Sequence, residues 1–292
     1  MRKAMIQAVS NMIAEYNNTA LLLIDIGAWA FREVLEGYPE RAKNIGIFEP
    51  GTIGLAAGLA LAGITPTVYG ISPFIVQRAL EQLKLDFVYQ NIGGNFITTG
   101  ASYDFSSLGY SHYCPEDIAT LKLLPGMEVV APGTPAQFNA LFAACWNDGH
   151  PTYFRMTDHC NQTEVSVEFG KASVLKRGTK ATVITSAEML DASLEACSGL
   201  DVTVLYYTTL APFDRTALIK NFVGGKIFVC TPYYIGTLTN DILQALNGTP
   251  IQIEEVGVPL QILRTYGTKK EKDAHLGLDA KSIRERLVAF VR

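Results

Sequence analysis

Short apolar runs alternate with segments of helical spacing along most of the chain. Apolar runs of about four to eight residues are typical of buried strands, and longer segments with an apolar stripe are typical of helices. Up to residue 156, the pattern predicts strands at 19–27, 44–48, 65–70, 87–92, 127–133 and 152–156. It predicts helices at 1–18, 28–39, 51–63, 72–86, 115–124 and 134–149. Buried strands that alternate with helices indicate a parallel sheet covered on both faces.

A polar stretch at 157–180 interrupts this series, and a second series follows it. The second series has predicted strands at 181–186, 202–207, 226–230 and 251–256, and predicted helices at 187–197, 214–222 and 236–248. We therefore expect an α/β protein with two doubly wound domains. The first, with a mostly parallel sheet, is expected at 1–168, and the second, smaller one at 169–292.

The composition limits the classes of function. Of the 292 residues, 48% are hydrophobic and only 18% are charged, which predicts that subunit contacts cover part of the surface. The net charge of −4 and the lack of any Lys/Arg run argue against nucleic-acid binding. No apolar run reaches the ~18 residues of a membrane span, so we expect no membrane insertion.

The five cysteines form no Cys-x-x-Cys pair, and their number is odd. This usage is typical of buried thiols in a reducing cytoplasm, and it indicates neither a disulfide framework nor a zinc site.

One carboxylate stands out against this apolar background. Glu49 is the only charged residue between Asn44 and Gly63, and a run of Gly and Ala follows it. It has two interpretations. An acid at this place caps the following helix, or it lies in an apolar cleft where it shares a proton with a basic partner.

The segment around Glu49, "GIFEPGTIGLAAGLALAG", resembles the pyrimidine-binding domain of transketolases and deoxyxylulose-phosphate synthases. Four more segments resemble the same family in the same order. They are "SPFIVQRALEQL", "LGYSHYCPEDIATLKLLPGMEVVAPGTP", "YFRMT" and, in the second domain, "LAPFD". A single motif of this kind is weak, but the ordered set covers essentially the whole chain.

The resemblance implies thiamine diphosphate as the cofactor and assigns residues to it. Glu49 is expected to bind the ring nitrogen of the aminopyrimidine, Phe74 to stack on that ring, and Ile71 to flank it. His112 matches a histidine that hydrogen-bonds a substrate carbonyl or moves its proton. Without the resemblance, Phe74 is typical of a core aromatic and His112 of a polar loop residue.

The substrate residues implied by the resemblance are less uniform. Arg155, near a strand end, and Arg2, in "RKA", match arginines that bind substrate phosphate. Two positions depart from the family. Leu108 stands where transketolases carry an Asp that receives a substrate hydroxyl, and Tyr113 stands where a Gln is usual.

The chain contains no Gly-Asp-Gly motif, which in this family begins the site for the diphosphate and Mg²⁺. The resemblance therefore implies the C-terminal half of a split transketolase. A separate N-terminal-half subunit would supply the magnesium ligands, and the expected assembly is a heterotetramer of two copies of each chain. The expected substrates are sugars or sugar phosphates, with a role in specialised or surface carbohydrate synthesis.

Two alternatives stay open. The β subunit of a 2-oxo acid dehydrogenase shares the two-domain plan, although the segment around His112 is more similar to transketolases. A non-catalytic scaffold subunit is the other, and the presence of both Glu49 and His112 argues against it.

Overall fold

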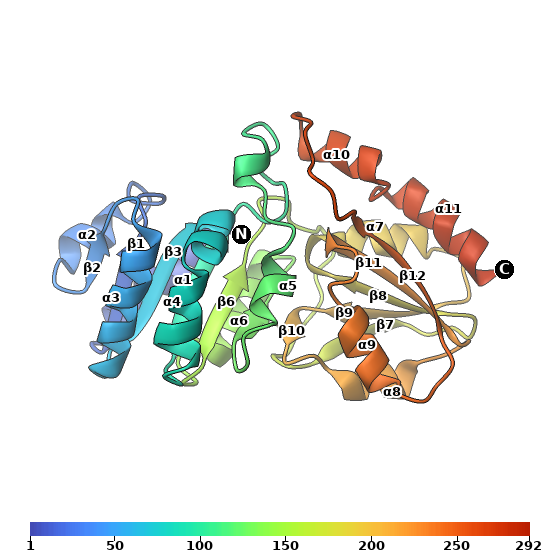
Figure 1. Cartoon of the computed structure of the whole chain (residues 1–292), viewed down its shortest axis with the longest axis horizontal. Coiled ribbons are helices and arrows are strands. Elements are labelled where there is room, and N and C mark those ends of the chain that lie inside the picture. The colour runs from blue at the N-terminus through green and yellow to red at the C-terminus, as the bar shows by residue number, and fades with distance from the viewer.

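The first sheet of the structure, a computed structural model that describes residues 1–292, has seven strands in the order β10-β5-β6-β4-β3-β1-β2 (Figure 1). The strands are β1 (Thr19–Leu23), β2 (Ala42–Asn44), β3 (Thr65–Ile71), β4 (Gly94–Thr99), β5 (Glu128–Val130), β6 (Pro151–Arg155) and β10 (Thr209–Ala211). All of its pairs are parallel except that of β10 with β5.

Helices cover both faces of this sheet, because neighbouring residues of a strand point to opposite sides. In β1, Leu22 packs in one apolar core, and Leu21 and Leu23 pack in another. The α-helices of this half are α1 (Arg2–Glu15), α2 (Arg32–Gly37), α3 (Glu49–Leu61), α4 (Leu80–Gln82), α5 (Asp117–Leu121) and α6 (Pro135–Cys145). The π-helical turns are η1 (Phe74–Arg78) and η2 (Leu83–Val88), and the 3-10 turn is η3 (Tyr110–His112).

The second sheet has five strands in the order β12-β11-β8-β9-β7. They are β7 (Ala172–Lys176), β8 (Thr182–Ser186), β9 (Thr203–Tyr207), β11 (Lys226–Tyr234) and β12 (Gln252–Val258). Only β7, which pairs with β9, is antiparallel. Its helices are η4 (Ala187–Met189), α7 (Leu190–Ala196), α8 (Arg215–Asn221), α9 (Thr239–Ala245), α10 (Lys269–Leu276) and α11 (Ala280–Val291). The predicted α/β class with two mostly parallel sheets is confirmed.

The two sheets lie side by side in Figure 1 and share one apolar core. That core contains Ile53 and Phe87 from the first half and Leu205 and Val229 from the second. Strand β10 follows β9 in sequence but joins the first sheet. The boundary expected after residue 168 therefore stays a proposal, since β10 crosses back over it.

One stretch of the first half was predicted wrongly. The run at 87–92 was expected as a strand, but η2 and a turn occupy it, and the next strand is β4. Phe87 ends fully buried as part of a helical turn. Gly94 begins β4 because a Cβ there would lie 2.7 Å from the Phe87 ring. The absence of a Cβ at Gly94 therefore permits close packing of the helical turn on the strand.

No helix of the chain combines the length and the apolar character needed to cross a membrane. The predicted cytoplasmic location stays a prediction.

Candidate active site

Three predicted site residues follow the carboxyl ends of parallel strands of the first sheet. Glu49 begins α3 after β2, Phe74 begins η1 after β3, and His112 ends η3 in the long connection after β4. Because the carboxyl ends of parallel strands meet at one edge of a sheet, the fold gathers these side chains there. Open α/β sheets bind ligands at this edge.

The Glu49 side chain is buried, with 4% of its surface exposed. Its hydrogen-bond partner is Arg78, whose Nη1 lies 3.2 Å from Oε1 and 3.4 Å from Oε2. Glu49 lies in the first turn of α3, where its charge suits the helix N-terminus. Its carboxylate accepts hydrogen bonds from Arg78 and so also faces a cation across the site.

Aromatic side chains adjoin the Glu49–Arg78 pair. The guanidinium carbon of Arg78 lies 3.9 Å from the centre of the Phe74 ring. The rings of Phe74 and His112 meet edge to face with centres 5.2 Å apart. Ile71, the last residue of β3, is half-buried beside this turn. The structure thus brings Glu49, Phe74 and His112 into one chain of contacts through Arg78.

The His112 loop is anchored by its own residues and by the second half of the chain. The Ser111 hydroxyl lies 3.0 Å from His112 Nδ1. Tyr113 is buried, and its hydroxyl lies 3.0 Å from the backbone carbonyl oxygens of both Ser106 and Thr265. Tyr113 therefore ties the loop to the segment that contains Thr265 in the second half of the chain. Leu108 is 53% exposed in the same loop.

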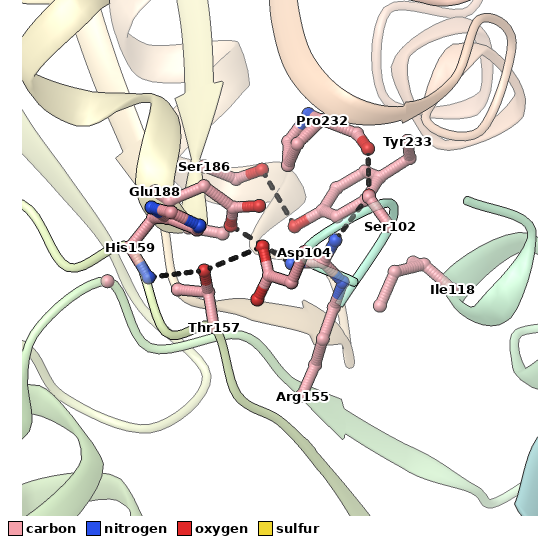
Figure 2. A network of polar contacts seen from close by, with 12 residues as sticks. Ser102, Asp104, Ile118, Arg155, Thr157, His159, Ser186, Glu188, Pro232 and Tyr233 are labelled. Carbon is pink, nitrogen blue, oxygen red and sulfur yellow. Dashed lines mark hydrogen bonds and ion pairs between the residues drawn. The ribbon is translucent and has the colours of Figure 1, made fainter. Parts of the chain in front are cut away.

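Arg155 does not lie open to a substrate, contrary to its predicted role (Figure 2). Its side chain is fully buried. Its Nε donates to Asp117 at 3.1 Å, its Nη1 to Glu188 at 3.0 Å and its Nη2 to the Ser102 hydroxyl at 2.6 Å. The guanidinium also stacks on Tyr233, 4.7 Å from the ring centre. With its donors taken by protein groups, Arg155 joins the two halves of the chain, and we drop it from the proposed substrate contacts.

Asp104 lies beside this network and carries a perturbed proton affinity. The Thr157 hydroxyl and the Asp158 backbone N–H donate to its two oxygens at 3.2 and 3.0 Å. Burial, followed by the charge of Glu188, raises the pKa of Asp104 to about 7. Burial and the nearby Glu188 charge therefore favour the protonated form of Asp104 at and below neutral pH.

Arg2 lies at the carboxyl end of β4, where its Nη2 is 3.3 Å from the Thr99 hydroxyl. The same nitrogen lies 3.3 Å from Asp158, and both side chains are about two-fifths exposed, at 43% and 42%. No contact joins Arg2 to Glu49, Phe74 or His112. Its role toward a substrate phosphate stays a prediction.

Two features of the site were missed from the sequence. Arg78 was recognised only as one letter of a motif, although it is the partner of Glu49. Its position four residues after Phe74, at the end of an apolar turn, was the available signal. The network of Asp104, Asp117 and Glu188 around Arg155 had no local signal, because its members are far apart in sequence.

Comparison with known proteins agrees with this geometry. Residues 1–159 match the family described as "Transketolase, pyrimidine binding domain". The chain is 34% identical over 276 residues to the "Uncharacterized 33.6 kDa protein in fasciation locus" of Rhodococcoides fascians, which covers 93% of this chain and 88% of that protein. It is 28% identical over 264 residues to an apulose-4-phosphate transketolase subunit from Actinobacillus succinogenes, covering 85% of this chain and 84% of that protein.

Among solved structures, the chain is similar to one described as "Split gene transketolase, inactive beta4 tetramer". The TM-score is 0.84 at 24% identity, over 99% of this chain and 97% of that one. At this identity the likeness shows the fold alone, and the match at 1–159 carries the relationship. The chain belongs to the transketolase family, in which it corresponds to the C-terminal half that contains the pyrimidine-binding domain.

Proposed function

We propose that this chain is one subunit of a two-chain, thiamine diphosphate-dependent transketolase-like enzyme that transfers a two-carbon ketol unit between sugars. The observation that carries the proposal is the buried Glu49 carboxylate, which Arg78 joins to the face of Phe74, with the His112 ring packed edge to face against Phe74. Relatives whose names describe them as parts of two-chain transketolases support it at the level of the family.

The residues present fit the pyrimidine end of the cofactor. An aminopyrimidine is flat and carries N–H donors when protonated, and this site already holds a flat N–H donor, the Arg78 guanidinium, between Glu49 and Phe74. A buried carboxylate is a strong acceptor for a charged N–H group, and an aromatic face stacks on a flat ring.

The residues present do not form the diphosphate end. Glu49 and His112 offer an acid and an imidazole, and neither is joined by the further oxygen ligands that a Mg²⁺–diphosphate pair needs. Large apolar side chains next to Glu49 are exposed, Ile47 at 71% and Phe48 at 60%. Both features support a partner chain that covers this edge and supplies the Mg²⁺ ligands, with a heterotetramer as the proposed assembly.

Each residue of this chain then has a stated role. When bound, thiamine diphosphate supplies the nucleophilic carbon that attacks the donor ketose. Glu49 accepts a hydrogen bond from the pyrimidine ring nitrogen, and Phe74 sets the plane of that ring. The Ser111 hydroxyl lies 3.0 Å from His112 Nδ1, and in the proposed role it donates to Nδ1, so that the imidazole proton is on Nε2. His112 Nε2 is then able to donate to a substrate carbonyl oxygen.

Reconstitution tests the proposal. The chain is co-expressed with a candidate partner that carries the Gly-Asp-Gly motif and a downstream Asn, encoded beside it. Xylulose 5-phosphate and ribose 5-phosphate are supplied with thiamine diphosphate and Mg²⁺, and products are followed by mass spectrometry. We expect a sugar phosphate two carbons longer than the acceptor, formed only when both chains are present.

Parallel reactions separate this activity from the alternatives. A supply of pyruvate or another 2-oxo acid in place of xylulose 5-phosphate tests for decarboxylation. Release of CO₂ without any ketol transfer would replace the transketolase assignment with that of a 2-oxo acid enzyme. A complex that assembles but has neither activity would support a scaffold.

A further inference from the structure

We propose that Arg78 is an internal stand-in for the aminopyrimidine of the cofactor. Its guanidinium occupies the aminopyrimidine position before the cofactor binds, and it must leave that position when the cofactor arrives. The inference rests on the proposed function, because it concerns the same half-site. It goes beyond it by assigning a positioning role to a residue outside the set predicted from the sequence.

The Arg78 guanidinium occupies the position over the Phe74 ring and next to both oxygens of Glu49. Its guanidinium carbon lies 3.9 Å from the centre of the Phe74 ring, which is a stacking distance. Its Nη1 is within 3.4 Å of both oxygens of Glu49. A ring that stacks on this face of Phe74 and donates to Glu49 would need the space that the guanidinium fills.

The chemistry of the two groups is similar. A guanidinium is a flat, delocalised cation whose N–H groups donate to a carboxylate. A protonated aminopyrimidine is also flat and presents N–H donors from the ring nitrogen and the amino group. Glu49 and Phe74 therefore select for a shape and a charge that Arg78 satisfies within the chain.

Burial explains why the stand-in is needed. The Glu49 side chain is only 4% exposed, and a buried carboxylate without a partner destabilises the folded chain. Arg78 removes that destabilisation in the chain before assembly. Its own side chain is 48% exposed, so it is able to swing toward solvent. It ends the π-helical turn η1, after which Ala79 departs from helical geometry at φ −113° and ψ 20°.

The test compares thiamine diphosphate binding by the assembled complex for the wild type, Arg78→Met and Arg78→Lys. Met keeps an apolar stem without N–H donors, and Lys keeps the charge without the flat group. Arg286→Met is the matched control, because Arg286 also pairs with a carboxylate, Glu254 at 2.7 Å, but on the second sheet. Calorimetric titration with thiamine diphosphate and Mg²⁺ measures the dissociation constant of the assembled complex. Thermal unfolding measures the melting temperature of the isolated chain.

We expect Arg78→Met to lower the dissociation constant about tenfold or more and to lower the melting temperature of the isolated chain. Arg78→Lys should fall between Met and wild type, and Arg286→Met should leave the dissociation constant unchanged. A dissociation constant that stays equal or rises in Arg78→Met would overturn the inference, because Arg78 would then remain beside Glu49 when the cofactor binds.

The failure of the proposed function gives a different result. If neither the wild-type complex nor any variant binds thiamine diphosphate, both the function and the stand-in are rejected. If the wild type binds it and Arg78→Met binds it no more tightly, only the stand-in is rejected. Arg78→Lys guards against a Met variant that fails to assemble, because a Lys variant that binds less tightly than the wild type would also overturn the inference.

Discussion

At the residue scale, the chemistry of this chain depends on how single charges are paired inside it. Glu49 faces Arg78 at the site, and Arg155 gathers Asp117 and Glu188 between the two halves. The first pair has one half-exposed member and is able to open. The second cluster is fully buried and holds the fold. Burial thus separates the ion pair to which we assign a function from the one that holds the two halves together.

Glu49→Gln should lower the activity of the assembled complex by about a hundredfold or more while leaving the fold intact. An amide accepts a hydrogen bond but does not share a proton with the ring nitrogen. Steady-state rates at saturating cofactor, with circular dichroism of the chain, measure this effect. Glu81→Gln, at an exposed acid of α4, is the control. Retention of more than about a tenth of the wild-type rate would show that Glu49 does not serve the reaction.

Leu108 should favour acceptors that lack the hydroxyl next to the reacting carbonyl. Its exposed side chain offers no acceptor for that hydroxyl, which then loses about 1–3 kcal/mol of hydrogen bonding. The measurement is the ratio of rates with a deoxy or keto acceptor and with glyceraldehyde 3-phosphate, in the wild type and in Leu108→Asp. We expect Leu108→Asp to shift the ratio toward glyceraldehyde 3-phosphate about tenfold. If the wild type prefers glyceraldehyde 3-phosphate and Leu108→Asp leaves the rate ratio unchanged, Leu108 does not determine acceptor specificity and only packs within the loop.

Asp104 should make the chain less stable as the pH rises from about 4 to about 7. Its folded-state pKa of about 7 lies above its ordinary value of 3.8, so the folded state keeps a proton that the unfolded state has lost. The stability lost grows up to about pH 7 and is constant above it. Glu188 contributes no slope above about pH 5, because Arg155 helps to lower its pKa and it is ionised there in both states.

Asp104→Asn should therefore flatten the dependence of the unfolding free energy on pH between about 5 and about 7. Urea unfolding of the wild type and the variant at several pH values measures it. Asp201→Asn is the control, because hydrogen bonds from Thr179 lower the pKa of Asp201 and place its titration below this range. A variant with the full wild-type slope would show that Asp104 is ionised throughout.

At the element scale, sequence reasoning worked where a strand or helix carries its own pattern. The strand predicted at 65–70 is β3, and the helix predicted at 134–149 contains α6. It failed where tertiary packing decided the outcome. The apolar run at 87–92 had the composition of a strand, but Phe87 closes a helical turn against β4. Edge strand β7 lies in the polar stretch at 157–180, where no apolar run marked it.

The outer face of α3 shows what its small residues do. Ile53, Ala56 and Ala57 are buried in the core of this chain, while Gly58 is exposed with nothing within 4 Å of an added Cβ. We expect Gly58→Leu to leave the isolated chain folded and to weaken its assembly with the partner. The leucine side chain would keep the partner chain from approaching this face of α3 closely.

Sedimentation of mixtures of the two chains measures this assembly, and melting of the isolated chain measures its fold. Ala289→Leu, on the exposed side of α11, is the control for adding the same side chain to a helix surface. Assembly of Gly58→Leu with wild-type affinity would place the partner elsewhere.

At the scale of the whole molecule, the sequence predicted the family, the two-sheet plan and the positions of Glu49, Phe74 and His112. These are residues in ordered motifs that a resemblance identifies one by one. It did not predict that Arg155 is enclosed, because Asp117 and Glu188 approach it from separate elements. It did not predict Arg78 as the partner of Glu49 either, since only the turn η1 sets that contact.

The two halves of the chain are joined firmly enough to present one site edge to a partner. Besides the Arg155 cluster, the hydroxyl of Tyr103 donates to Asp273 at 2.7 Å, and Lys122 pairs with Asp241 at 2.5 Å. These contacts link the first half to the second at separate points. The edge that contains Glu49 is therefore held in place by the whole chain, and we propose it as the pyrimidine half of a cofactor site.

The central claim, that this chain is half of a two-chain thiamine diphosphate enzyme, is tested most directly by calorimetric titration of thiamine diphosphate and Mg²⁺ into the chain alone and into the chain mixed with its Gly-Asp-Gly partner. We expect no tight binding to the chain alone, because it lacks the Gly-Asp-Gly motif that begins the diphosphate and Mg²⁺ site in this family, and a clear saturable isotherm for the mixture. A dissociation constant of about a micromolar or below for the single chain, about −8 kcal/mol of binding free energy, would contradict it.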